Sequence, residues 1–136
     1  MYIDTSCLAA YYLPEPKSDT VQEIIQQNDT IVISYLTEIE LLSAIRKRQR
    51  MGELSETDGN KTWKLFKNHR KSGLFDIAEL DADVFKSAEL LLETTSTALR
   101  SLDAIHLGIA HAHGFDLYTF DNTMIRVANE FNIELV

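Results

Sequence analysis

The stretch Met1-Tyr2-Ile3-Asp4-Thr5-Ser6 decides the fold of this chain. A short apolar run ends at an aspartate and small hydroxyl residues follow it, which predicts a buried strand that passes directly into a helix. The pattern returns near the other end of the chain, in Leu117-Tyr118-Thr119-Phe120-Asp121-Asn122-Thr123. In an open parallel sheet, ligands bind at the carboxyl ends of the strands. We therefore expect Asp4 and Asp121 to meet at one edge of a sheet.

Length and composition are those of an ordinary globular domain. The chain has 136 residues, of which 45% are hydrophobic and 25% charged, and we expect a single domain over residues 1–136. No stretch approaches the roughly 20 apolar residues of a membrane helix, and no secretory signal is evident. The single cysteine, Cys7, excludes an internal disulfide and fits a cytoplasmic, reducing environment. We expect it to be a small core residue rather than a nucleophile.

The net charge of −8 conceals an uneven distribution. Residues 46–71 contain nine of the thirteen Lys and Arg residues and three acidic residues, so this segment carries +6 and the remainder −14. A basic segment on an acidic body can bind phosphate groups locally. The alternative is a pair of solvated helices whose charges only favour solubility. The basic residues are Arg46, Lys47, Arg48, Arg50, Lys61, Lys64, Lys67, Arg70 and Lys71.

Strands and helices alternate along the chain. Short β-branched or apolar runs predict strands at 2–3, 30–33, 75–80, 115–120 and 133–136. Apolar residues at helical spacing predict helices at 5–13, 18–27, 35–50, 81–93, 101–113 and 122–131, with a further helix from Ser55 to Gly73. Such alternation implies parallel β-α-β crossovers. We expect an α/β domain with a parallel sheet of four or five strands, helices on both faces, and the first strand central beside the strand of Leu117.

Four acidic residues carry the chemistry that we expect. Asp4 and Asp121 end strands, Glu40 lies on a largely apolar helix, and Asp103 lies in the first turn of another helix. Acidic groups are costly to bury unless a positive group joins them. Carboxylate oxygens that converge from separate elements suit a hard divalent cation, Mg²⁺ or Mn²⁺. Such a cation can orient a phosphate, activate a water and stabilise a leaving oxygen.

Each carboxylate also has a purely structural explanation. Asp4 and Asp121 could cap helices, Asp103 could complement a helix dipole, and Glu40 could pair with a basic side chain. These explanations do not account for all four acids falling where one sheet edge could collect them. The histidines compete weakly for a metal, because the i, i+4 spacing of a helical zinc pair is absent. We expect structural or solvated roles for them, His106 included.

Four short motifs, in order along the whole chain, resemble those of PIN-domain ribonucleases, above all the VapC-like toxins of toxin–antitoxin pairs. They are Tyr2-Ile3-Asp4-Thr5-Ser6 with Ala9-Ala10-Tyr11-Tyr12, Ser34-Tyr35-Leu36-Thr37-Glu38-Ile39-Glu40-Leu41, Ser101-Leu102-Asp103-Ala104-Ile105-His106-Leu107, and Thr119-Phe120-Asp121. The second motif places the acidic residue at Glu40 rather than at Glu38. The resemblance implies a PIN-like three-layer α/β/α domain.

The resemblance also implies an activity. Asp4, Glu40, Asp103 and Asp121 would form the metal-holding site of a Mg²⁺- or Mn²⁺-dependent endoribonuclease. Ser6 and Thr119 would support it by hydrogen bonds, and Arg100 would pair with an acid or contact a phosphate. Independently of the resemblance, the charge of Arg46 and the rest of the basic segment makes them candidates to bind RNA or an antitoxin. The implied partners are an RNA with a tRNA or rRNA loop as its target, a cognate antitoxin and a second copy in a homodimer.

Two other families share a strand-end aspartate, and a PIN-like fold without catalytic activity is a further alternative. A haloacid-dehalogenase-type phosphatase needs a second Asp two residues after the first, where this chain has Ser6. A response-regulator receiver needs an acidic pair and a late Lys that are missing here. A non-catalytic PIN-like module that binds RNA or protein would have no chemical need for four intact acids. The endoribonuclease is therefore the favoured hypothesis.

Overall fold

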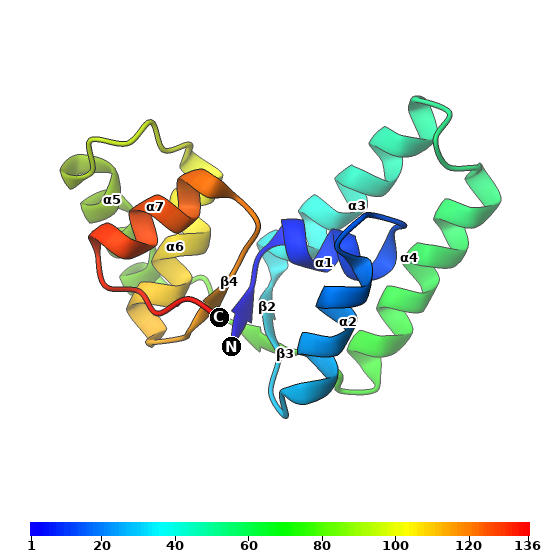
Figure 1. Cartoon of the computed structure of the whole chain (residues 1–136), viewed down its shortest axis with the longest axis horizontal. Helices are drawn as coiled ribbons and strands as arrows, with labels where there is room; N and C mark the ends of the chain where they lie inside the picture. The colour runs from blue at the N-terminus through cyan, green and yellow to red at the C-terminus, as the bar shows by residue number, and fades with distance from the viewer.

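A four-stranded parallel sheet lies between two layers of helices in the computed structural model, which covers residues 1–136 (Figure 1). The strands are β1 (Tyr2–Ile3), β2 (Val32–Ser34), β3 (Asp76–Ala78) and β4 (Leu117–Tyr118). The helices are α1 (Thr5–Tyr12), α2 (Ser18–Gln27), α3 (Tyr35–Arg50), α4 (Glu56–Lys71), α5 (Ala82–Thr94), α6 (Ser101–His113) and α7 (Asn122–Glu130). The order β3-β2-β1-β4 confirms the predicted parallel sheet, with β1 inside it and beside β4.

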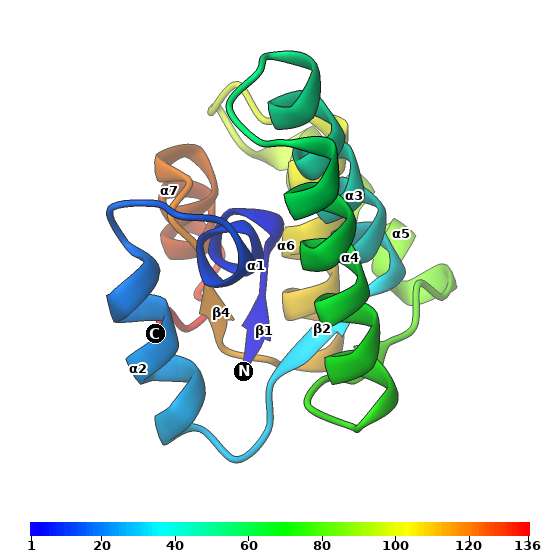
Figure 2. The same ribbon diagram turned by 90° about the vertical axis from the view of Figure 1, so that its right-hand side faces the viewer.

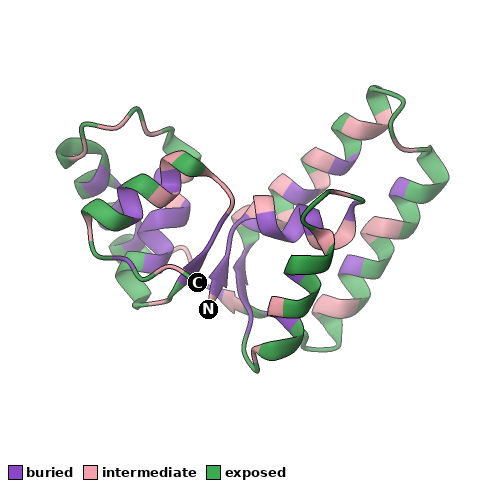
Figure 3. Cartoon of the chain, in the orientation of Figure 1, coloured by how far each residue is buried: buried purple, intermediate pink, exposed green.

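Each face of the sheet has its own hydrophobic core, because successive strand residues point to opposite faces. Ile3 and Ile33 pack with buried residues of α1 to α4, whereas Tyr2, Val32 and Leu117 pack with those of α5 to α7. Figure 3 shows the strands buried throughout, apart from part of β3, and the outer sides of the helices exposed. The three-layer α/β/α arrangement predicted from the sequence is therefore confirmed.

The carboxyl ends of the strands point to one side of the molecule, and helices begin there. Figure 2 shows β1, β2 and β4 side by side, each leading toward the helix that follows it. Asp4 caps α1 and Asp121 caps α7, because their side chains accept backbone N–H bonds of the first turn. Ser34 and Thr37 form a reciprocal capping pair at the start of α3. The three helix starts thus gather side chains at one edge of the sheet.

β1 has its predicted bounds, three other predicted strands are longer than those in the structure, and the last predicted strand is wrong. β1 has two residues because Asp4 already begins the turn into α1, so its pairing with β4 stops at Ile3 and Tyr118. Residues 133–136 form no strand, and Leu135 makes only an isolated bridge to Leu117. The chain reverses direction at Asn132, where φ is 54°, and Ile133 then turns into the core. The sheet therefore has four strands rather than five.

Cys7 lies fully buried in α1, beneath the start of the helix. Its backbone N–H donates to Asp4 Oδ1 at 3.1 Å, and its thiol donates to the Tyr118 carbonyl oxygen at 3.3 Å. Burial raises the pKa of the thiol far above its ordinary value, so the group stays a neutral thiol. Cys7 is a core residue, as expected, and it connects α1 to β4.

No helix in this fold combines the length and the apolar character that crossing a membrane demands.

Candidate metal centre

Asp4 stands at the end of β1 and is only 4% exposed. Its Oδ1 accepts hydrogen bonds from Ser6 Oγ at 2.7 Å and from the Cys7 backbone N–H at 3.1 Å. Its Oδ2 accepts from Thr119 Oγ1 at 2.7 Å, across the boundary between β1 and β4. Three donors from two segments far apart in sequence therefore fix the orientation of this carboxylate.

Asp121 follows β4 at the same edge. Its Oδ1 accepts the backbone N–H groups of Thr123 at 2.7 Å and Met124 at 2.9 Å, while its Oδ2 makes no hydrogen bond. The segment before it is tied to the Asp4 cluster, since Thr119 Oγ1 accepts the Asp121 N–H at 3.0 Å. Ser6 Oγ likewise accepts the Phe120 N–H at 3.0 Å. The hydroxyls of Ser6 and Thr119 thus join the two strand-end aspartates in one hydrogen-bonded unit.

Glu40 reaches this edge from the second turn of α3. Its Oε2 accepts from Thr5 Oγ1 at 2.5 Å and lies 2.6 Å from His106 Nε2, whereas its Oε1 makes no hydrogen bond. Burial opposes its ionisation, but the hydrogen bonds from His106 and Thr5 outweigh burial and lower the pKa of Glu40. Glu38, two residues earlier, points elsewhere and pairs with Arg70 of α4 at 3.1 Å. The two glutamates of the second motif are therefore in different environments.

Asp103, in the first turn of α6, is the carboxylate without hydrogen bonds. Partial burial, followed by repulsion from Asp121 and, more weakly, Glu40, raises its pKa. His106 and Arg100 act in the opposite direction. The influence of Asp121 and Glu40 on one group means that acids from three separate elements share one electrostatic environment.

The four carboxylates are of the ligand type that a hard divalent cation prefers, although their oxygens are not close enough together to coordinate one. No three Asp, Glu, His or Cys side chains converge to metal-binding distances in this arrangement. Glu40 Oε1, Asp121 Oδ2 and both Asp103 oxygens are free of hydrogen bonds, and all-oxygen ligation is what Mg²⁺ and Mn²⁺ prefer. A cation would also offset the burial and the repulsion that together raise the Asp103 pKa. The unrestrained Asp103 side chain is the one that can move to complete such a site.

The two predicted arginines lie in different places. Arg100 precedes α6 and lies close enough to Asp103 to oppose the rise of its pKa. Arg46 is exposed on the far half of α3, where its Nη1 donates to Gln49 at 2.8 Å and to Asn60 at 3.2 Å. It contacts none of the four acids. Any part that Arg46 has in binding belongs to the α3–α4 hairpin and not to the carboxylate cluster.

The basic segment forms this hairpin, which extends beyond the sheet in Figure 1. Two of its nine cations are already paired: Arg48 bonds with Glu15, and Arg70 bonds with Glu38. Lys67 and Lys71 line a shallow hollow of about 240 Å³ with that Arg70–Glu38 pair. The local cationic surface is therefore smaller than the charge count of the segment suggests.

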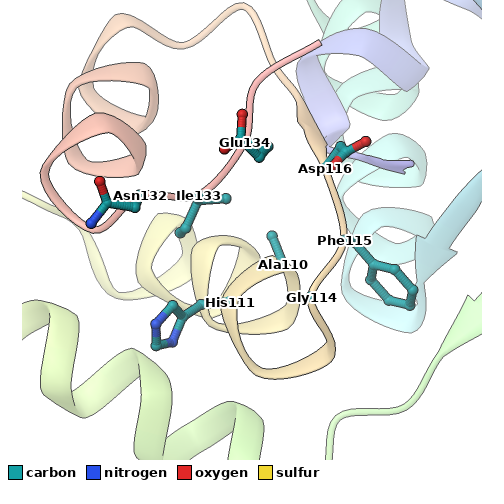
Figure 4. Close-up of a pocket in the computed structure, with 8 residues that line it drawn as sticks. All are labelled: Ala110, His111, Gly114, Phe115, Asp116, Asn132, Ile133 and Glu134. Carbon is teal, nitrogen blue, oxygen red and sulfur yellow. The ribbon is translucent and has the colours of Figure 1, made fainter.

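Two further hollows flank the molecule. One of about 130 Å³ lies between the end of α6 and the segment after α7 (Figure 4), at the amino end of β4 and thus opposite the carboxylates. The other, of about 370 Å³, adjoins the cluster and is lined by Ser6, Pro16, Lys17 and Phe120 among others. Lys17 Nζ lies 4.0 Å from the centre of the Phe120 ring. Only the second hollow borders the candidate site.

His106 is the residue whose contact with the site was not predicted. It is 2% exposed and hydrogen-bonded to Tyr2 and Glu40, which agrees with the structural role that we expected, but its contact with one of the four acids was not foreseen. The sequence did contain one signal, because His106 follows Asp103 by three residues and so shares its side of α6. Its contact with Glu40, 66 residues away in the chain, depends on how α3 and α6 meet at the sheet edge.

Comparisons with known proteins agree with this architecture. The family model of the PIN domain matches residues 1–130. The chain is similar to Ribonuclease VapC46 of Mycobacterium tuberculosis (strain ATCC 25618 / H37Rv), with 27% identity over 139 residues, 100% of this chain and 95% of that protein.

Solved structures share the fold at low sequence identity. VapC20 of Mycobacterium tuberculosis, a sarcin-ricin loop cleaving toxin, has a TM-score of 0.72 at 17% identity, over 92% of each chain. A toxin-antitoxin complex from Klebsiella pneumoniae has a TM-score of 0.63 at 18% identity, over 88% of this chain and 85% of that one. With a family model that spans nearly the whole sequence and an acidic edge built from all four motifs, this chain belongs to the PIN domain family.

Proposed function

We propose that this chain is a Mg²⁺- or Mn²⁺-dependent endoribonuclease and the toxin of a toxin–antitoxin pair. The observation that supports the proposal is the electrostatic influence of Asp121 and Glu40 on Asp103, together with the hydrogen bonds through Thr119 that link Asp4 to Asp121. Glu40, Asp103 and Asp121 each keep at least one carboxylate oxygen without a hydrogen bond. The similarity to Ribonuclease VapC46 supports the reaction class.

Asp4, Glu40, Asp103 and Asp121 would hold the cation. When bound, a divalent cation activates a water and neutralises charge on a phosphodiester during hydrolysis. Thr119 and Ser6 keep the Asp4 carboxylate in one orientation, and the backbone N–H groups at the start of α7 do the same for Asp121. Arg100, exposed beside Asp103, is suited to contact a non-bridging phosphate oxygen. A phosphate backbone cannot approach so acidic an edge without a cation, so we expect the activity to require metal.

The substrate that fits this chemistry is RNA with an accessible loop. VapC20, which shares the fold, cleaves the sarcin-ricin loop, and unstacked loops are the form in which RNA exposes its backbone and bases. The exposed lysines of the α3–α4 hairpin would add sequence-independent affinity for phosphates. Hydrolysis in this class would leave a 5′-phosphate and a 3′-hydroxyl.

The proposed partners are a cognate antitoxin and a second copy of the chain. A protein of the same fold occurs in a toxin-antitoxin complex. An acidic cluster of this kind offers a basic antitoxin segment charged hydrogen-bond partners. An antitoxin that covers the cluster would block both cation and RNA.

The test compares purified, antitoxin-free protein with its Glu40→Gln and Glu38→Gln variants on a pool of structured RNAs. Each protein is assayed with Mg²⁺, with Mn²⁺ and with chelator, and the product ends are mapped. We expect metal-dependent cleavage by the wild type and the Glu38→Gln variant, and loss of cleavage in the Glu40→Gln variant. Equal cleavage by both variants would reject the four-acid site. Cleavage that persists in chelator would reject metal dependence.

A further inference from the structure

His106 reaches the candidate site from within the core. Its ring lies between two partners, with Nε2 2.6 Å from Glu40 Oε2 and Nδ1 2.6 Å from the Tyr2 hydroxyl. We propose that His106 is a positioning residue that holds one oxygen of Glu40, so that the other oxygen faces the cation. This inference rests on the metal site of the proposed function. It adds His106 as a residue that contacts a metal ligand rather than the metal itself.

The Tyr2 hydroxyl fixes the far side of the ring. Tyr2 is fully buried in β1, and its hydroxyl lies 3.0 Å from Ser34 Oγ and 3.2 Å from Thr37 Oγ1. Those two residues form the capping pair of α3, the helix that carries Glu40. The ring of His106 is therefore anchored to the same helix start that positions its carboxylate partner.

The hydrogen-bonding capacity of the groups assigns the direction of the contact. A carboxylate can only accept, so Nε2 must carry the proton that it donates to Glu40. Pairing of this kind between a carboxylate and one ring nitrogen sets the tautomer and the plane of the ring. Because Thr5 Oγ1 donates to the same oxygen, Oε2 has two donors and Oε1 is left for a ligand.

The contact also sets the spacing between two of the proposed ligands. His106 and Asp103 lie three residues apart on α6 and are neighbours on the helix surface. A bond from His106 to Glu40 thus ties α6 to α3 one turn from Asp103. Loss of the bond would leave Glu40 Oε2 with Thr5 as its single donor, while α6 stays in place because its buried residues pack into the core. Removal of such outer partners typically costs 10–100-fold in metal affinity or activity.

The experiment measures Mn²⁺ binding by calorimetry, without substrate, in two variants of nearly equal size. The side-chain nitrogen of Gln can replace Nε2, so His106→Gln keeps a donor for Glu40. That of Asn matches Nδ1, so His106→Asn keeps only the contact with Tyr2. We expect His106→Asn to weaken Mn²⁺ affinity by about 10–100-fold and His106→Gln to recover most of it. The matched control is His111→Asn, on the same helix, whose ring bonds with Ser87 at 2.6 Å away from the acids and whose loss should leave affinity unchanged.

A double-mutant comparison separates positioning from general stability. If His106 acts through Glu40, the His106→Asn substitution should have little further effect on Mn²⁺ affinity in a Glu40→Gln protein. Equal affinities for the Asn and Gln variants, whether reduced or unchanged, would overturn the inference while leaving the metal site intact. Wild-type protein that binds no Mn²⁺ would instead reject the proposed function, and the inference with it. Circular dichroism establishes that each variant is folded.

Discussion

Asp4 and Asp103 belong to the same acidic edge but are held in opposite ways. Asp4 is buried and accepts three hydrogen bonds that join α1, β1 and the segment after β4. Asp103 accepts none, and its environment disfavours its charge. The difference shows that Asp4 has a structural role of its own, because its carboxylate caps α1 and links that helix to the segment after β4. Asp103 has no such structural role, and in the proposed site a bound cation would give its carboxylate a favourable partner.

The largest expected effect is on RNA cleavage, where we expect Asp4 and Asp103 to be equally important. Asp4→Asn and Asp103→Asn should each lower RNA cleavage by about 100-fold or more, the scale of removing one preorganised electrostatic contact. Single-turnover cleavage in saturating Mn²⁺ measures this effect. Full activity in the Asp103→Asn protein would remove that residue from the ligand set.

Stability should then separate the two residues. Asp4→Ala removes a helix cap and leaves Ser6 and Thr119 without their acceptor, so we expect a loss of about 3 kcal/mol in the free energy of unfolding. Asp121→Ala loses only a cap, worth about 1 kcal/mol. Urea unfolding in chelator measures both values. An Asp4→Ala protein as stable as the Asp121→Ala protein would contradict the view that Asp4 is a structural joint.

Stabilisation of the folded protein by a bound cation should depend on Asp103, the residue without hydrogen bonds. A metal that binds only the folded protein stabilises it by about 2.7 kcal/mol at one hundred times its dissociation constant. Thermal unfolding with and without Mn²⁺ should show this gain in the wild type and a much smaller one in Asp103→Asn. Since the cluster is acidic, NaCl at equal ionic strength serves as the control. A gain of equal size in the variant would indicate non-specific screening.

The smallest expected effect concerns pH in the absence of metal. Because the folded pKa of Asp103 is raised, the folded state binds its proton more tightly, and its contribution to stability falls as pH rises from the unfolded pKa through the folded one. Glu40 has a lowered pKa, so its contribution is present above its unfolded pKa and is lost as pH falls. Asp103→Asn should thus stabilise the metal-free protein at neutral pH by less than about 1 kcal/mol, given the solvent screening at a partly exposed group. Destabilisation by this substitution in chelator would show that Asp103 has an attractive partner.

Sequence reasoning succeeded where local patterns decide the structure. Helices α2, α3 and α6 have the predicted bounds because helical spacing is a local signal, with the Ser34–Thr37 capping pair at the start of α3 and Gly114 at the end of α6. The placement of Asp4 beside β4 followed from the strand-end rule alone. The final strand failed because pairing depends on a partner, and the chain after Asn132 meets β4 at only one bridge.

The contacts of the site were harder to predict because they are distant in sequence. His106 contacts Tyr2 across 104 residues and Glu40 across 66, and nothing local to its helix specifies either contact. Arg46 shows the same limit, since its charge suggested a binding role but could not place it, and its neighbours are Gln49 and Asn60 rather than the acids. Net charge reports on a segment, whereas the direction of each side chain is a tertiary property. The sequence thus anticipated Ser6 and Thr119, which lie beside the strand-end aspartates and donate to Asp4, but not the contact of the more distant His106.

The buried thiol of Cys7 makes it possible to measure how often α1 separates from β4. It is the chain's single cysteine, it is inaccessible in the folded state, and it lies between Asp4 and Tyr118. An alkylating reagent can modify it only when α1 separates from β4, so the rate of labelling would follow the opening of that joint. The native sequence thus carries its own chemical reporter, with one reactive position and no background from other cysteines.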